Sequence, residues 1–230
     1  MTTAGMRGYV LAGGESSRMQ RPDLPQDKAL LLLGGQTLLE RALATLAHVC
    51  PEPQILCGSK DRCARLRHLG PTLVDEVLLA GPLGGLHAAL ADARKHEAAW
   101  ALITPVDLPR MSAALLHAFV QAGQCSGAGV ACLRAVGIVQ PLPVLLHTSA
   151  EPFLRTALHA GERKLRPVLQ GVAKQIGDCS GIFLTDVETF GFPAEAAEAC
   201  FRNLNTPDDF DGAQQDETLR TGLHQSKHGG

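Results

Sequence analysis

The strongest constraint on the fold is the alternation of short apolar runs with longer segments of helical periodicity. Residues 9–12 have the length and composition of a strand, and residues 36–48 repeat leucine and alanine at helical spacing. This rhythm is typical of a mainly parallel sheet with helices on both faces. We therefore predict an α/β fold, a Rossmann-like three-layer sandwich. The strands expected in the first half of the chain are residues 9–12, 54–57, 72–74 and 100–104.

The start of the first helix is marked by a capping box. The hydroxyl oxygen of Thr37 can accept from the amide of Glu40, while the Glu40 carboxylate reaches back to the Thr37 amide. Apolar spacing predicts further helices at residues 86–93, 151–159, 164–170 and 194–202.

The rhythm changes after about residue 127. Residues 127–133 and 137–146 are consecutive strand candidates with no helix between them, which predicts an antiparallel excursion. Pro141 and Pro143 cannot donate to a ladder, so the second of these strands should lie at an edge or be irregular. A further strand is expected at residues 182–186.

Length and polarity predict how the chain is divided. We expect one domain over residues 1–211 of the 230-residue chain. Residues 212–230 are polar and lack periodicity, so we expect a disordered C-terminal tail there.

Charge and cysteine content argue against several classes of protein. Lys plus Arg number 21 and Asp plus Glu 23, with no block of like charges, which argues against binding of nucleic acid. The seven cysteines include no C-x-x-C pair and are expected to be reduced thiols. The nine histidines form no metal-spaced cluster. The chain has no secretory signal and no run of about 18 apolar residues, so we expect a cytoplasmic protein that binds no membrane. We also expect a monomer.

Glycines and cations follow the first predicted strand, at the place where ligands bind in an open parallel sheet. Gly13 and Gly14 let backbone amides approach a phosphate, and Arg18 and Lys28 can add positive charge. The segment matches neither the Walker pattern nor the dinucleotide-binding glycine pattern. On spacing alone, a plain strand-to-helix turn explains it equally well.

Carboxylates follow two other predicted strands. Asp75 precedes a glycine-rich segment, residues 81–86, that permits close approach to a base or sugar, although a structural turn would use the same glycines. Asp107 follows the apolar residues 100–103, where Mg²⁺ would satisfy it together with substrate phosphates and water. Asp107 could instead cap a helix, although Ser112 is an equally good cap. Together the three strand ends outline a site for a nucleoside triphosphate.

Seven motifs, in order along residues 8–210, resemble the molybdenum cofactor guanylyltransferase family. They are Leu11-Ala12-Gly13-Gly14 with Arg18-Met19, Asp27-Lys28-Ala29-Leu30, Gly81-Pro82-Leu83-Gly84-Gly85-Leu86, Asp107-x-Pro109, Gln140-Pro141-Leu142-Pro143, Ala160-Gly161-Glu162-Arg163-Lys164 and Asn203-x-Asn205-Thr206-Pro207. The resemblance implies transfer of GMP from GTP to the terminal phosphate of molybdenum-bound molybdopterin, which releases pyrophosphate and forms the guanine dinucleotide cofactor. It also implies Mg²⁺ as the cofactor, and molybdoenzymes or their chaperones as further partners.

The same resemblance implies roles for individual residues. The catalytic residues would be Lys28, Asp107 and Arg18, with Lys28 and Arg18 meeting the phosphates and Asp107 ligating Mg²⁺. The remaining residues would bind substrates: the backbone of Leu11, Ala12 and Gly13 and the side chain of Asp75 on the nucleotide, and Asn203 and Asn205 near the pterin.

The chain departs from the family pattern in two places. Residues 20–26 lengthen the loop before Lys28, and a family asparagine is replaced near Cys57 and Gly58. A cytidylyltransferase acting on the same pterin, another small-molecule nucleotidyltransferase and a non-catalytic cofactor-delivery partner are the alternatives. The sequence Ala12-Gly13-Gly14 favours the guanylyl enzyme over the cytidylyl one.

Overall fold

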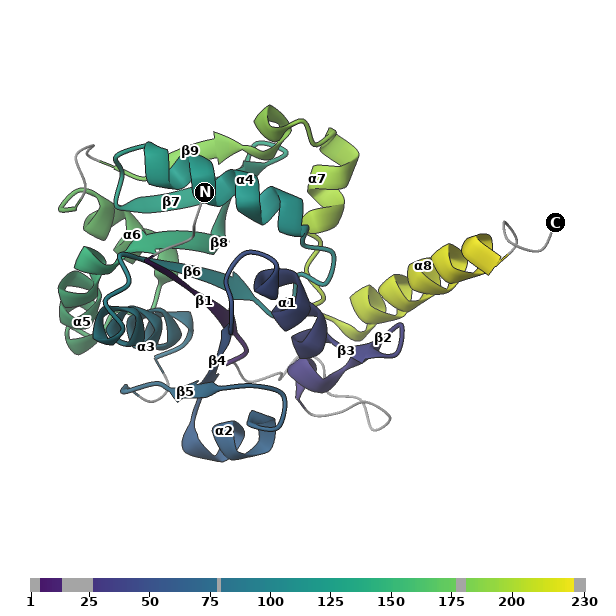
Figure 1. The fold of residues 1–230 in the computed structure, drawn as a ribbon, viewed down its shortest axis with the longest axis horizontal. Helices are drawn as coiled ribbons and strands as arrows, with labels where there is room; N and C mark the ends of the chain where they lie inside the picture. Colours follow the sequence, from purple (N-terminus) through teal and green to yellow (C-terminus); the bar gives the residue numbers. More distant parts are fainter. Residues whose placement is uncertain (1–4, 14–26, 78–79, 177–180, 226–230) are drawn as a thin grey trace.

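A computed structural model describes residues 5–13, 27–77, 80–176 and 181–225, with only the backbone of residues 219–225. Its main feature is a seven-stranded sheet in the order β5-β4-β1-β6-β8-β7-β9 (Figure 1). The strands are β1 (Met6–Leu11), β4 (Gln54–Gly58), β5 (Thr72–Val74), β6 (Trp100–Pro105), β7 (Val130–Ala135), β8 (Ile138–His147) and β9 (Phe183–Asp186). A short hairpin of β2 (Leu32–Leu33) and β3 (Gln36–Thr37) stands apart from this sheet.

Helices cover both faces of the sheet, so the predicted three-layer α/β architecture is confirmed (Figure 1). The α-helices are α1 (Leu38–Ala47), α2 (Lys60–Leu66), α3 (Pro82–Lys95), α4 (Ala113–Cys125), α5 (Glu151–His159), α6 (Leu165–Ala173), α7 (Ala194–Cys200) and α8 (Pro207–Gln225). The 3₁₀ helices are η2 (Lys28–Leu30), η3 (Thr148–Ala150) and η4 (Val187–Phe190). Side chains of α1, α2, α4 and α7 pack on one face, and those of α3, α5 and α6 pack on the other.

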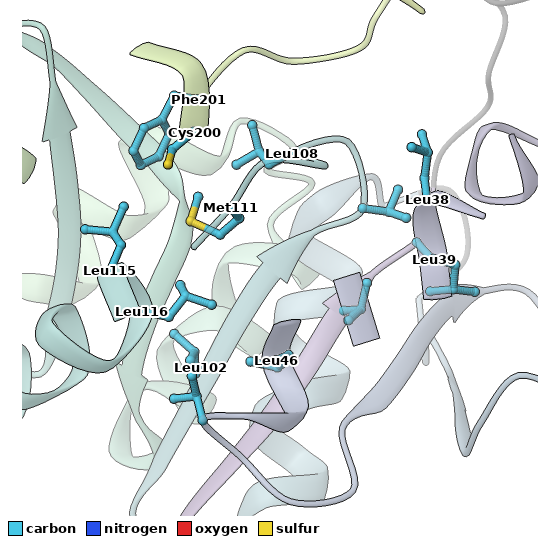
Figure 2. Packing of buried hydrophobic residues seen from close by; sticks show 14 of the residues in the cluster. Leu38, Leu39, Leu46, Leu102, Leu108, Met111, Leu115, Leu116, Cys200 and Phe201 are labelled. Carbon is cyan, nitrogen blue, oxygen red and sulfur yellow. The ribbon is translucent and has the colours of Figure 1, made fainter. Parts of the chain in front are cut away.

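The central strand β1 explains why the sequence needs two apolar layers. Successive side chains of a strand point to opposite faces. Val10 accordingly packs into one core, whereas Tyr9 and Leu11 pack into the other. Figure 2 shows the first of these cores, where leucines of α1 and α4 meet Leu102 of β6.

The predicted antiparallel excursion is present, since β8 runs antiparallel to both β6 and β7. Strand β8 lies inside the sheet and not at its edge, and it is irregular, as the prolines require. Cys132 faces Val144 and the next residue, Leu133, faces Gln140, so the ladder skips the segment that holds Pro141 and Pro143. An interior strand therefore tolerates two residues that cannot donate to a ladder.

The C-terminal segment differs from its prediction, because residues 212–225 continue helix α8 and are not a disordered tail. Phe210 and Ala213 are buried on the body of the protein, and Glu217 pairs with Arg41 of α1 at 2.5 Å. The rest of α8 extends away from the other elements (Figure 1). A helix packed along so narrow an edge can be polar on most of its surface, which is why its sequence lacks an apolar period.

Two further sequence predictions concern membranes and thiols. None of the helices in the described part of the chain is both long and apolar enough to cross a membrane. The six cysteines within the described residues carry free thiols, as expected, and Cys179 lies outside those residues.

The capping box of α1 is formed as predicted and provides a test of local stability. The Glu40 amide donates to Thr37 Oγ1 at 3.1 Å, and the Thr37 amide donates to Glu40 Oε2 at 2.8 Å. We expect Thr37→Ala to lower the free energy of unfolding by about 1 kcal/mol, measured by urea denaturation. Thr37→Ser keeps the accepting oxygen and serves as the control, and equal stability of the two variants would contradict a role for the cap.

Candidate active site

Three polar side chains from distant parts of the chain meet beside the carboxyl end of β6. The ammonium nitrogen of Lys28 lies 3.2 Å from Asp107 Oδ2 and 3.0 Å from Asn205 Oδ1. Lys28 is the first residue of η2, Asp107 follows β6, and Asn205 precedes α8. The structure thus brings together a cation, a carboxylate and an amide that the sequence motifs placed in one site.

Backbone hydrogen bonds fix the two segments that carry Asp107 and Asn205. The Leu204 amide donates to the Asp107 carbonyl oxygen at 3.2 Å, which ties the end of β6 to the segment before α8. The Asn205 amide donates to Asp209 Oδ2 at 3.0 Å. That carboxylate also accepts from the amide and hydroxyl of Thr206, and these hydrogen bonds lower the pKa of Asp209 below its usual value.

The predicted backbone cradle lies one strand away, at the end of β1. The Val106 amide donates to the Leu11 carbonyl oxygen at 3.1 Å, so the ends of β1 and β6 are joined directly. The Ala12 amide donates to the Leu56 carbonyl oxygen of β4 at 3.1 Å, and Ala12 is buried. Gly13 follows as an exposed residue. Among the described residues at the end of β1, Gly13 is therefore the one whose backbone a ligand can most readily reach.

Asp75, at the end of β5, is half-buried and only partly satisfied. Its Oδ1 atom has no hydrogen-bond partner among the residues that the structure describes. Its Oδ2 atom lies against Gly84, where an added Cβ would come within 2.6 Å of that oxygen. Burial raises the pKa of Asp75 to about 6, and the nearby His87 lowers it by a smaller amount. A carboxylate of this kind can accept a hydrogen bond from a ligand.

The structure brings some of the predicted site residues into contact and leaves others apart. Lys28, Asp107 and Asn205 are in contact. Leu11, Ala12 and Gly13 lie at the end of β1 and Asp75 at the end of β5, at the same edge of the sheet but with β4 between the two strands. Asn203 is exposed, and the contact with Lys28 is made by Asn205. Arg18 lies outside the described residues. The helix-cap alternative for Asp107 is wrong, because Ser112 caps α4.

The donor set at Asp107 fits a magnesium ion held jointly with a substrate. Among the residues that the structure describes, no group of three or more His, Cys, Asp or Glu side chains could hold a metal ion. Mg²⁺ keeps several waters and is often bound by one or two carboxylates plus substrate phosphates, so it does not need such a group. The Asp107 side chain is one-quarter exposed and therefore accessible to a metal and phosphates.

One buried side chain near this site was not predicted from the sequence. Arg62 of α2 donates from Nη2 to Asp27 Oδ1 at 2.5 Å, and Asp27 is the residue before Lys28. A charged residue on a short helix is usually exposed, so a single sequence offers no signal for this contact.

Comparison with known proteins places the chain in a family. A family model described as the MobA-like NTP transferase domain matches residues 8–178, which is more than half of the chain. The chain belongs to this family. Its match covers β1, Lys28, Asp75 and Asp107, and it confirms the resemblance stated from the sequence motifs.

Relatives within the family cover nearly the whole chain. A molybdenum cofactor guanylyltransferase from Serratia proteamaculans is 31% identical, over 92% of this chain and 95% of the relative. A molybdenum cofactor guanylyltransferase from Xanthomonas euvesicatoria is 33% identical, over 87% of this chain and 90% of the relative. The crystal structure of molybdopterin-guanine dinucleotide biosynthesis protein A from Archaeoglobus fulgidus has the same fold, with a TM-score of 0.75 and 23% identity over 93% of this chain and 99% of that one.

The raised pKa of Asp75 predicts a pH-dependent stability. The folded pKa of about 6 lies above the unfolded value of about 4, so folding opposes ionisation of this carboxyl and its cost is fully present above pH 6. We expect Asp75→Asn to be more stable than the wild type at pH 7.5, by on the order of 1 kcal/mol after allowing for solvent screening. The advantage should shrink as pH falls from 6 to about 4. Urea denaturation across this pH range measures the difference in free energy of unfolding between the variant and the wild type. A difference that does not change with pH would contradict the raised pKa of Asp75.

Proposed function

We propose that this protein transfers GMP from GTP to the terminal phosphate of molybdenum-bound molybdopterin, forming molybdopterin guanine dinucleotide and pyrophosphate. The observation that carries the proposal is the contact of Lys28 with Asp107 at the carboxyl edge of the sheet, beside the glycine turn after β1. Relatives with guanylyltransferase names, aligned over about nine-tenths of the chain, support the choice of substrates.

The chemistry requires few catalytic groups. The acceptor is a phosphate monoester, which is largely ionised at neutral pH because its second pKa is about 6. It therefore needs no protein base to become a nucleophile. The site must hold the two phosphates in line and stabilise the charge that develops on the leaving pyrophosphate.

The residues of this site are suited to those two tasks. In the proposed reaction, Lys28 donates to the phosphate oxygens of GTP, where its charge opposes the negative charge that grows on pyrophosphate. The backbone of Leu11, Ala12 and Gly13 binds the nucleotide, and Asp75 accepts a hydrogen bond from one of its N–H or O–H groups. Arg18 adds a second cation. Asn205 accepts a hydrogen bond from the Lys28 ammonium in this structure. In the proposed complex, Asn205 and Asn203 face the pterin.

Asp107 has a different role in the proposal, as the ligand of Mg²⁺. The metal, when bound by Asp107 and the substrate phosphates, supplies positive charge at the transferring phosphoryl group. In this structure the Asp107 carboxylate accepts from the Lys28 ammonium. A bound triphosphate would offer that ammonium a competing anion, and the Asp107 carboxylate would then be available to hold the metal.

Substitution of the two charged residues tests the reaction itself. We expect Lys28→Ala and Asp107→Ala each to lower the rate of pyrophosphate release by about 100-fold or more, because each removes charge stabilisation of the transition state. The assay mixes GTP, Mg²⁺ and molybdenum-bound molybdopterin and measures pyrophosphate and the dinucleotide product. Lys174→Ala, which changes an exposed lysine at the end of α6, is the control and should be fully active. Wild-type rates in Lys28→Ala and Asp107→Ala would contradict the proposal.

The choice of nucleotide is tested by binding. A ligand that binds only the folded state raises the melting temperature, and at equal concentration the tighter ligand raises it more. We expect GTP with Mg²⁺ to raise the melting temperature more than CTP or ATP at the same concentration. A larger shift with CTP would assign the protein to the cytidylyl reaction instead. The cytoplasmic location, the monomeric state, and the molybdoenzyme or chaperone partners stay predictions.

A further inference from the structure

A largely buried ion pair joins helix α2 to Asp27, the residue that precedes Lys28. Arg62 of α2 donates from Nη2 to Asp27 Oδ1 at 2.5 Å, across 35 residues of sequence. Both side chains are only 10% exposed. A charged pair so largely withdrawn from water is unusual on a surface helix of seven residues.

Stability alone does not account for this pair. Removing two charges from water costs about as much free energy as their attraction returns, and apolar residues of similar size are often as stable or more so. Buried pairs of this kind therefore need another explanation in each protein. What the pair can supply is a fixed position for the Asp27 carboxylate.

The Asp27 carboxylate controls the segment that carries Lys28. The same Oδ1 atom that accepts from Arg62 also accepts from the Ala29 amide at 3.1 Å, and so caps η2. This helix has only three residues and cannot be held by its own length. Its other anchors include the buried side chain of Ala29, the bond from the Leu30 amide to the Asp27 carbonyl oxygen at 2.9 Å and the bond from the Leu31 amide to the Lys28 carbonyl oxygen. The Asp27 cap is therefore one of the contacts that set where the Lys28 side chain begins.

We infer that Arg62 is a positioning residue, which holds the η2 segment, and with it Lys28, at the candidate active site by fixing the Asp27 cap. The inference rests on the proposed function, in which Lys28 stabilises the leaving pyrophosphate. Arg62 itself contacts neither Lys28 nor Asp107 in any hydrogen bond of the described residues, and it acts through Asp27. A loosened ammonium would bind the triphosphate in several positions and stabilise the transition state less, so kcat should fall more than KM rises.

The first test measures Lys28 directly and needs no substrate. The purified full chain is methylated with formaldehyde and a borane reductant at one fixed pH, and the rate at the Lys28 amine is followed by mass spectrometry of its peptide. We expect Lys28 to be labelled several times faster in Arg62→Met and in Asp27→Asn than in the wild type. The labelling rate in Arg62→Lys, which keeps the charge, should lie between the wild-type rate and the rate in Arg62→Met. Arg65→Met, on an exposed position of the same helix, is the matched control and should label at the wild-type rate.

The second test separates positioning from a general loss of stability. We expect Arg62→Met to lower kcat for pyrophosphate release by about ten- to a hundredfold, as loss of a residue that orients a catalytic group commonly does. In a Lys28→Ala background the same substitution should have no further effect on kcat, because the residue it positions is gone. A merely structural role would give the same loss of kcat in both backgrounds, and that result would overturn the inference.

The two tests distinguish failure of this inference from failure of the proposed function. If the wild type makes no dinucleotide product, the proposed function fails, and the labelling rates still decide whether Arg62 holds Lys28. If the wild type is active but Lys28 labels equally in Arg62→Met, Asp27→Asn and the wild type, the inference is overturned and the function stands. Asp27→Asn changes one atom, so it keeps the test decisive even if Arg62→Met does not fold.

Discussion

The site depends on the way the central strand β1 is held at its carboxyl end. The Leu11 carbonyl oxygen accepts from the Val106 amide, and the Ala12 amide donates to the Leu56 carbonyl oxygen, so three strand ends are fixed at one level. Parallel strands bring their carboxyl ends to one edge of a sheet, and these two bonds continue that alignment beyond the strands. The glycine turn and Asp107 consequently face one region, although they are far apart in the sequence.

Much of this arrangement follows from local signals in the sequence. The strands are short apolar runs, and α1 begins at a capping box. The candidate site residues directly follow these apolar runs, so they can be identified without knowing how the helices between the strands pack. The meeting of Lys28 and Asp107 was predictable because motif resemblance placed both on one triphosphate. The family comparison confirms that resemblance, while the roles of the individual residues stay predictions.

Other features could not be predicted because they depend on tertiary contacts. Strand β8 looks like an edge strand from Pro141 and Pro143, yet the ladder simply skips those residues and continues. Helix α8 has no apolar period because, of its described side chains, the apolar ones buried in the core are Phe210 and Ala213, while its other contacts with the body are polar. Arg62 is one of the two arginines of helix α2, and only the fold shows that its side chain is buried against Asp27.

The position of Asn205 has a consequence for synthesis on the ribosome. Its side chain meets Lys28 across 177 residues, and the neighbouring Leu204 amide holds the Asp107 carbonyl oxygen. Four strands of the sheet, β1, β4, β5 and β6, are synthesised well before this segment. The N-terminal half of the nascent chain can therefore fold while Leu204 and Asn205 are still absent from the site. The complete arrangement of Lys28, Asp107 and Asn205 can therefore form only after translation has passed residue 205.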